Sequence, residues 1–351
     1  MASQDNSGLA FTFAQKQQGF RLLELPPAIL DIINSENPPI LSLKSTATAS
    51  ANSHAVLCTP DRTFQLRQVH SSNSIFLIEP SAPGISLEDN AASGSTIQVT
   101  GSSKETLELI PTSPPTRFLL RSQLNVYHGP QEADDDFETM PSVSKTAQRS
   151  RMDIFANIPA SANEIAQAWR ELCAFESSDQ SWLPSTSALS RIWRDLTECA
   201  ALKGVQLGSN FHATDLWPLL EDCGYPHGFY EAILSRLDPN DHPSPHENRV
   251  IDRKKCVPWV GAVLLESCTE NGDTTTKDFL KTWADQVPEE WRGDVSLDLI
   301  KGKYSQPTTS TIAFDHAAVK EEESKGSANA QAKGAPRSRK WHEKFRPASK
   351  K

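Results

Sequence analysis

The chain has 351 residues, of which 37% are hydrophobic, and its net charge at pH 7 is −9. This length allows two or more domains, whereas no apolar run approaches the ~18–20 residues that a membrane-spanning helix needs. Residues 325–351 hold nine Lys/Arg and one Glu, so this tail carries +8 and the rest of the chain −17, which excludes a protein that coats DNA by bulk charge.

The first part of the chain alternates apolar and polar residues with a period of two, which is typical of β-strands. Strands are predicted at His54–Thr59, Thr63–Val69 and Ser74–Ile78. Thr96–Thr100 and Glu105–Leu109 flank Gly101-Ser102-Ser103, and this pattern predicts a hairpin. A single helix is expected at Pro26–Ile33, with a proline in its first turn. Together these elements predict a mostly β barrel over residues 1–128.

Residues 129–150 are polar and have no hydrophobic period, so we interpret them as a linker. They include Asp134-Asp135-Asp136, which resembles a metal cluster. Three consecutive carboxylates do not converge on one ion without a fixed loop, so a solvated acidic linker explains them better.

After Arg151 the hydrophobic period changes to about 3.6, which indicates helices. Ser161 and Glu164 form a capping-box pattern at the start of one helix. The tryptophans at 193, 217 and 283 lie on apolar helical stripes, so we predict that they are core residues and not a platform for stacking bases. Residues 151–240 are therefore predicted to form helical, winged-helix-like modules. His242 and His246 follow in a proline-rich link, which we interpret as solvated and not as a zinc site.

Residues 249–318 predict one further module of the same kind. Helices are expected at Val257–Cys268, Asp278–Val287 and Val295–Lys303, followed by a β-prone segment at Thr308–Asp315. Three helices followed by a strand pair is winged-helix order, in which the third helix can enter a major groove.

Five cations of this module could reach DNA phosphates from one side: Lys277, Lys281, Arg292, Lys301 and Lys303. The alternative is a solvated surface, because residues 256–315 hold five Lys/Arg against ten Asp/Glu. Residues 319–351 are expected to be a disordered basic tail with two aromatic residues, Trp341 and Phe345. This tail could serve nuclear import, contact DNA or remain a solvated end.

The sequence offers no catalytic or cofactor-binding pattern. It has neither a glycine-rich phosphate loop nor a G-x-S-x-G turn. None of its cysteines, at 58, 173, 199, 223, 256 and 268, forms a C-x-x-C pair. We therefore expect a protein that is not an enzyme and that binds neither a metal nor a cofactor.

Three segments of the N-terminal part carry a resemblance to a known family. They read LLELPPAIL at 22–30, LSLKS at 41–45 and AVLCTPDRTFQLRQVHSSNSIFLI at 55–78. Together they resemble the sister chromatid cohesion subunit of the alternative, replication factor C-like clamp loader. The resemblance continues more loosely through FLKTWADQVPEEWRGDVSLDLIKGKY at 279–304, and so covers most of the chain.

The resemblance implies an α+β protein with a non-catalytic, nuclear role. It implies an N-terminal β-barrel completed by two partner chains, the large clamp-loader subunit and a small third subunit. Tandem winged-helix modules would follow, and the last would contact DNA without reading its sequence. The resemblance further implies a link to polymerase epsilon and support of sliding-clamp handling and chromatid cohesion; no membrane is expected.

Within the barrel, the apolar strand residues predicted to meet the partners are Leu57, Phe64, Leu66, Ile75 and Phe76. Two competing hypotheses stay open. One is a winged-helix transcription regulator, which would show a large ratio of specific to non-specific DNA affinity. The other is a scaffold that never touches nucleic acid.

Overall fold

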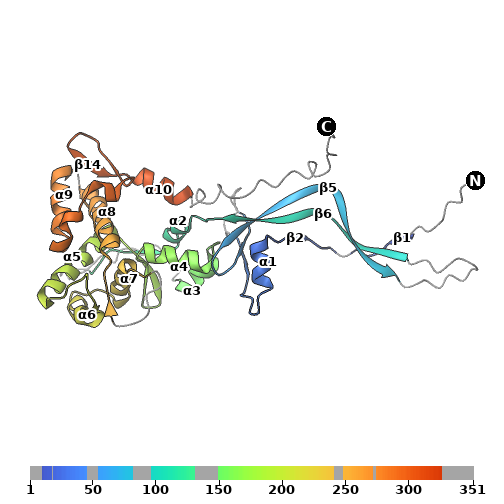
Figure 1. Ribbon diagram of the computed structural model, residues 1–351, viewed down its shortest axis with the longest axis horizontal. Helices are drawn as coiled ribbons and strands as arrows, with labels where there is room; N and C mark the ends of the chain where they lie inside the picture. Colours follow the sequence, from blue (N-terminus) through green and yellow to red (C-terminus); the bar gives the residue numbers. More distant parts are fainter. Residues whose placement is uncertain are drawn as a thin grey trace, which may run out of the picture. The chain divides into compact units, whose positions relative to one another are not determined.

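The computed structural model describes residues 10–17, 19–45, 54–81, 96–130, 149–240, 248–271 and 274–325. The chain divides into two compact units, residues 1–112 and 113–351 (Figure 1). The fold is of the mixed α+β class, as predicted, with the long strands in the first unit and most helices in the second. Several sequence interpretations lie outside the described residues: the three aspartates at 134–136, the two histidines at 242 and 246, and residues 326–351 of the predicted tail. The first residues of that tail, 319–325, are helical and not disordered as predicted.

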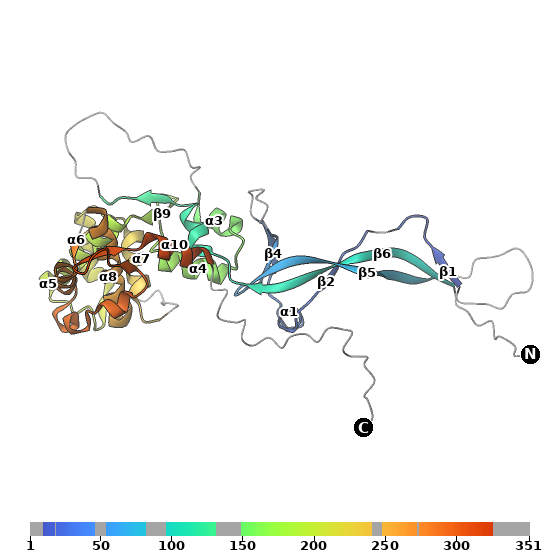
Figure 2. The same cartoon turned by 90° about the horizontal axis from the view of Figure 1, so that it is seen from above.

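A long antiparallel ribbon, made of β5 (Thr63–Ser81) and β6 (Thr96–Thr112), is the frame of the first unit (Figures 1 and 2). The shorter strands are β1 (Ala10–Phe13), β2 (Leu22–Glu24), β3 (Ser42–Lys44) and β4 (Val56–Cys58). The sheet order is β1-β6-β5-β4-β3, and β2 also pairs with β6. The described strands form a curled but open sheet, so they do not by themselves close the predicted barrel.

The hairpin predicted at Gly101-Ser102-Ser103 is wrong, because β6 runs through these residues as one strand. Gly101 lies opposite Leu77, and Ser103 lies opposite Ile75. The register shifts at two places, between His70 and Ile75 in β5 and beside Gly101 in β6, where Thr100 is skipped between the pairs Leu77–Gly101 and Ile78–Val99. Such a bulge re-aims a strand without ending it. Pairing along the whole of β5 therefore overrides the local turn signal in β6.

The first unit has a small hydrophobic core where β5 begins and β6 ends. Helix α1 (Pro27–Ile33) starts with a proline in its first turn, as predicted, and contributes a fully buried isoleucine. The buried members of this core are Ile29, Leu57, Phe64 and Leu109. Leu25, Leu41 and Leu66 pack against them and are partly buried. The far part of the ribbon has no comparable cover among the described residues.

The second unit repeats one order of elements: helix, strand, helix, helix and one or two strands. The first repeat comprises α2 (Thr116–Arg121), β7 (Asn125–Tyr127), α3 (Arg151–Asn157), α4 (Ala162–Glu171), β8 (Phe175–Ser177) and β9 (Gln180–Pro184). The second comprises α5 (Thr186–Lys203), β10 (Phe211–His212), α6 (Ala213–Asp222), α7 (His227–Leu237) and β11 (Asn248–Arg249). The third comprises α8 (Arg253–Asn271), β12 (Thr274–Thr275), α9 (Thr276–Asp285), the 3-10 helices η1 (Glu289–Asp294) and η2 (Leu297–Ile300), β13 (Tyr304–Ser305) and β14 (Thr311–Phe314). Helix α10 (His316–Lys325) follows and contacts α2.

The first and third repeats share a strand order but not the strand directions, because β7 pairs with β9 in parallel whereas β12 pairs with β14 antiparallel. The three-stranded sheets have the orders β7-β9-β8 and β12-β14-β13, so the last strand lies in the middle of each. In the second repeat β10 pairs with β11. The first repeat begins at α2, whereas the sequence placed α2 and β7 in the first domain. Strand β7 is hydrogen-bonded to β9, and α2 packs on α4, so both belong to the second unit.

Helix ends follow the sequence closely. Ser161 and Glu164 make the predicted capping box at the start of α4. Thr275 caps α9, accepting a hydrogen bond from the backbone N–H of Asp278 at 3.1 Å. Helix α5 ends at Gly204, whose φ of 65° is readily adopted only by glycine. Local capping chemistry therefore sets where these helices begin and end.

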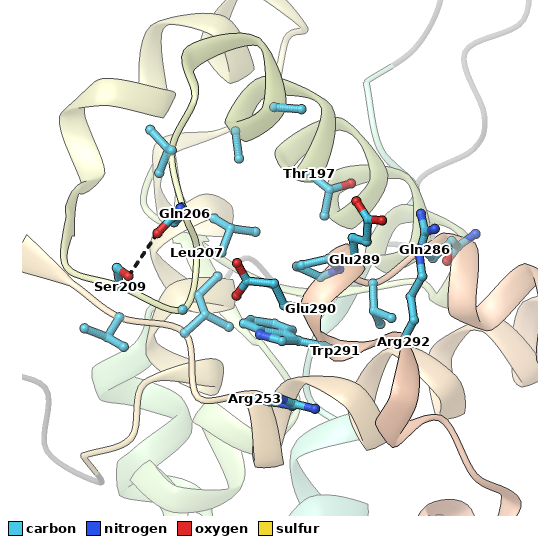
Figure 3. Close-up of a pocket in the computed structure, with 18 of the residues that line it drawn as sticks. Thr197, Gln206, Leu207, Ser209, Arg253, Gln286, Glu289, Glu290, Trp291 and Arg292 are labelled. Atoms are coloured by element: carbon cyan, nitrogen blue, oxygen red, sulfur yellow. Dashed lines mark hydrogen bonds between the residues drawn. The ribbon is translucent and has the colours of Figure 1, made fainter.

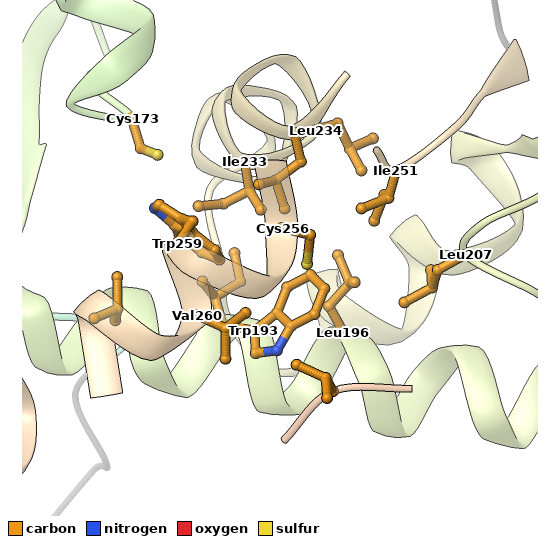
Figure 4. Packing of buried hydrophobic residues seen from close by; sticks show 14 of the residues in the cluster. Cys173, Trp193, Leu196, Leu207, Ile233, Leu234, Ile251, Cys256, Trp259 and Val260 are labelled. Atoms are coloured by element: carbon orange, nitrogen blue, oxygen red, sulfur yellow. The ribbon is translucent and has the colours of Figure 1, made fainter. Parts of the chain in front are cut away.

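The main core of the second unit is built mostly from its second and third repeats, and the first repeat adds Cys173 and Phe175 (Figure 4). Trp193 and Trp283 are buried in it, which confirms their predicted role, whereas Trp217 is only partly buried. Each buried indole also donates a hydrogen bond: Trp193 Nε1 to the carbonyl of Gln286 at 2.8 Å, and Trp283 Nε1 to the carbonyl of Val257 at 3.0 Å. These bonds satisfy the one polar group of each ring.

The helix predicted at Val295–Lys303 is wrong. Only one 3-10 turn, η2, forms there, because Ser296 is extended and its side chain caps the turn at the backbone N–H of Asp298. Gly302 then adopts a φ of 86°, which ends any helical path. The third repeat therefore has no long helix at the position from which a winged helix enters a groove.

Candidate partner and nucleic-acid surfaces

Four consecutive residues of β5, Ile75 to Ile78, form what we call the apolar strip. Their exposed fractions are 47%, 49%, 43% and 50%. Neighbouring side chains of a strand point to opposite faces, so both faces of the ribbon are uncovered here. Phe13 of β1 is 61% exposed and meets Phe76 edge-on, with ring centroids 6.4 Å apart. Exposed apolar surfaces are typical of interaction sites, so the strip is a candidate for one.

The structure separates the five residues that were predicted to meet partner chains. Leu57 and Phe64 are only 6% and 3% exposed, and they pack in the core of their own unit together with the partly buried Leu66. Ile75 and Phe76 are exposed and lie in the apolar strip. The sequence also missed exposed members, chiefly Leu77, Ile78 and Phe13, because an apolar run of this kind predicts burial on both faces.

The five candidate DNA-binding cations all expose side-chain surface, although the ammonium group of Lys303 is partly withdrawn from water, and they lie in three separate segments. Lys277 and Lys281 lie on α9, and Arg292 lies on η1. Lys301 and Lys303 follow η2. The structure thus places them in one repeat without joining them on one helix face.

Lys303 has surroundings that the sequence did not reveal. Loss of hydration lowers the pKa of its ammonium group, and the charges of Arg236 and Arg117 lower it further. Glu322 and Glu266 act in the opposite direction. The residue therefore lies among charges of α2, α7, α8 and α10. Two arginines from distant parts of the sequence join it there, and no local pattern could have shown this.

A groove of about 850 Å³ lies between the C-terminal end of α5 and the segment that joins α9 to η1 (Figure 3). Its floor is apolar and includes the buried Leu207, Ile251, Val287 and Trp291. Its rim includes four exposed carboxylates: Glu198, Asp285, Glu289 and Glu290. A groove with an apolar floor and a few polar groups has the general form of a ligand site.

Neither a metal site nor a reactive thiol stands out in the described part of the chain. No group of three or more His, Cys, Asp or Glu residues described here could hold a metal ion. Burial raises the pKa of Cys173 to about 12 and raises that of Cys256 well above its ordinary value. Both thiols are therefore protonated and unreactive near neutral pH. Among the described helices, none combines the length and apolarity needed to cross a bilayer.

Comparison with known proteins finds one family whose model spans both units. The family model described as "Sister chromatid cohesion protein Dcc1" matches residues 20–317. The sister chromatid cohesion protein DCC1 of Saccharomyces cerevisiae is 21% identical over 307 residues, which cover 84% of this chain and 79% of that protein. The matched region contains the apolar strip, the three repeats and all five candidate cations.

Proposed function

This chain belongs to the sister chromatid cohesion protein Dcc1 family, and on that basis we propose that it is a non-catalytic subunit of an alternative clamp loader. In this role it assembles in the nucleus with the large loader subunit and a small third subunit. It links the loader to polymerase epsilon and supports sliding-clamp handling during cohesion. DNA is contacted through phosphates without reading the sequence.

The observation that carries the proposal is the apolar strip on an open sheet. Fully burying an Ile, Leu or Phe side chain contributes ~1.5–3 kcal/mol. The four strip residues are about half exposed, so covering them offers roughly 1 kcal/mol each before the costs of association. Partner strands that add to the edges at β1 and β3 would also satisfy unpaired backbone groups. The strip and edges together support a barrel completed by other chains.

Assembly is tested by placing a charge on each face of the strip. Ile75→Asp and Phe76→Asp should each abolish co-purification of the two loader subunits when the three chains are co-expressed. Gln68→Asp is the matched control, because Gln68 is an exposed polar residue of the same strand, and it should leave assembly intact. Assembly of both strip variants at the wild-type level, with their fold unchanged, would remove the basis of the proposal.

The repeats of the second unit support its interpretation as winged-helix modules. Each has the order helix, strand, helix, helix and strand, and in two of them the last strand is central. The helix that would enter a groove is nevertheless engaged in packing. Helix α4 contacts α7, and α7 buries Phe229, Tyr230, Ile233, Leu234 and Leu237. We therefore propose phosphate contact by surface cations, which positions DNA but does not read bases.

DNA contact is tested with Lys301→Glu combined with Lys303→Glu in the assembled complex. Affinity for unrelated duplexes should fall by a similar factor for each, and the salt slope should flatten by about 0.9 for each lost phosphate contact. Arg194→Glu with Lys203→Glu, on the exposed side of α5, makes the same charge change and should have little effect. A large preference for one sequence would favour a transcription regulator, and no DNA binding by any form would leave only a scaffold.

A further inference from the structure

The groove between the second and third repeats contains none of the apolar strip and, of the five candidate DNA-binding cations, is lined only by Arg292. Its apolar floor combines Leu207 and Ile251 from the second repeat and its link to the third with Val287 and Trp291 from the third. Trp291 closes the bottom, since a Cβ atom at Gly208 would lie only 3.1 Å from its Cζ2 atom. The floor is thus preformed and hydrophobic.

The rim of the groove has an excess of negative charge. Among the described residues, none of the carboxylates of Glu198, Asp285, Glu289 and Glu290 has an ion-pair partner within 4.0 Å. Figure 3 shows the carboxylate of Glu290 between Leu207 and Trp291, and that of Glu289 beside Thr197. The rim has two arginines. Arg253 is paired with Asp294, which lies outside the groove, so Arg292 is the arginine left to offset the rim carboxylates. A ligand with several positive charges and an apolar anchor would complement both rim and floor.

The chain itself contains a segment of this chemistry. Residues 337–351, RSRKWHEKFRPASKK, hold seven Lys/Arg against one Glu and include Trp341 and Phe345. The fifteen residues between Lys325 and Trp341 can span up to ~50 Å when extended. A compact unit of the second unit's size has a diameter of roughly 45 Å. Over the surface of such a unit, this span covers more than half of the way from one pole to the other.

We propose that the groove binds residues 337–351 of the same chain. An aromatic side chain of the segment rests on the floor beside Trp291, and neighbouring lysines and arginines meet the rim carboxylates. The contact is intramolecular, so it gains from the effective concentration that a covalent connection of fifteen residues supplies. This inference does not depend on the identity of the chain's partners.

The experiment measures binding of a fluorescent peptide of residues 337–351 by anisotropy. The receptor is the chain truncated after Lys325, which should bind the peptide saturably. Glu289→Lys with Glu290→Lys should weaken binding at least tenfold, and so should Trp341→Ala with Phe345→Ala in the peptide. The untruncated chain should also bind at least tenfold more weakly, because its own segment occupies the groove.

The matched control is Glu221→Lys with Asp222→Lys at the exposed end of α6, which makes the same charge change outside the groove. It should alter affinity less than threefold. An equal loss in this control would reduce the interaction to bulk charge and overturn the proposal. Equal peptide affinity of the truncated and untruncated chains would exclude occupation by the chain's own segment. Concentration-dependent dimers that require the tail would assign the groove to a second copy and also contradict the intramolecular contact.

Discussion

Gly261 in the middle of α8 gives the sharpest test of how the second unit packs. An ideal Cβ atom built there would lie 2.3 Å from Cζ2 and 2.4 Å from Cε2 of Trp283. The indole has no room to yield, because it is fully buried and its Nε1 is hydrogen-bonded to the carbonyl of Val257. Gly261→Ala therefore forces the helix or the ring to move.

Two effects of this substitution oppose each other. Replacing a mid-helix glycine by alanine gains ~1 kcal/mol of helix propensity. Overpacking a tight core typically costs ~1–3 kcal/mol of stability. The new Cβ atom would lie more than ~1 Å closer to the ring than the optimal carbon–carbon separation, so the cost should be near the upper end of this range. The net result should be a loss of about 2 kcal/mol, or a fall in melting temperature of roughly 4–8 °C.

Tryptophan fluorescence is the suitable assay, because all eight tryptophans lie at or after Trp169, within the second unit. Gly293→Ala is the control, since nothing lies within 4 Å of a Cβ atom at that position, and it should change stability by less than ~0.5 kcal/mol. Adding Trp283→Leu to Gly261→Ala should cost less than the two separate losses combined. An increase in melting temperature for Gly261→Ala would refute the reasoning.

Further predictions concern a cap, an ion pair and the thiols. Ser161→Ala removes the capping box of α4 and should cost ~1 kcal/mol in thermal unfolding. Arg121→Ala should cost roughly 1 kcal/mol, because it removes the 3.4 Å ion pair to Glu323, whose side chain is only 8% exposed. Iodoacetamide at pH 8 should label the exposed Cys223 but not Cys173 until the protein unfolds. Labelling of Cys223 should still accelerate above pH 9, because desolvation and nearby carboxylates raise its pKa and so delay thiolate formation.

Each of these has a result that would contradict it. A melting temperature of Ser161→Ala equal to that of Ser209→Ala, in which no helix cap is changed, would show that the box contributes nothing. For Arg121→Ala, the loss should be smaller in 1 M salt, where the ion pair is already screened; an undiminished loss would point to packing instead. Peptide mapping that finds Cys173 labelled as fast as Cys223 would contradict the buried position of Cys173.

Features with a local cause could be predicted from the sequence. The capping box at Ser161 depends on residues three apart, and Pro27 fixes the first turn of α1 wherever that helix packs. The predictions that were wrong concern features set by contacts between residues far apart in the sequence. The sequence around Gly101 predicts a turn, whereas in the structure Gly101 lies within β6 and pairs with β5. The sequence assigned β7 to the end of the first domain. In the structure β7 pairs with β9, which comes much later in the chain.

The same limit applies to the candidate surfaces. Phe64 and Phe76 lie on one strand, and the uninterrupted apolar run around Phe76 predicts deeper burial than the alternating residues around Phe64. Helix α1 contributes Ile29 to the core around Phe64, whereas no described helix covers Phe76. Lys303 likewise reads as an ordinary surface lysine until α2 and α7 bring Arg117 and Arg236 near it. Burial and electrostatics at these sites are properties of the assembled unit.

The position of α2 and β7 determines what happens when the backbone is cleaved between β7 and α3. A nick anywhere in residues 131–148 leaves Leu120 and Leu124 in the N-terminal fragment and their core partners Ile154 and Ile165 in the C-terminal one. The fragments remain held by buried side chains and by the hydrogen bonds between β7 and β9. We therefore expect proteolysis there to yield a complex that migrates as one species until it is denatured. The same site suits a split reporter, since two separately made halves must find each other to complete the first repeat.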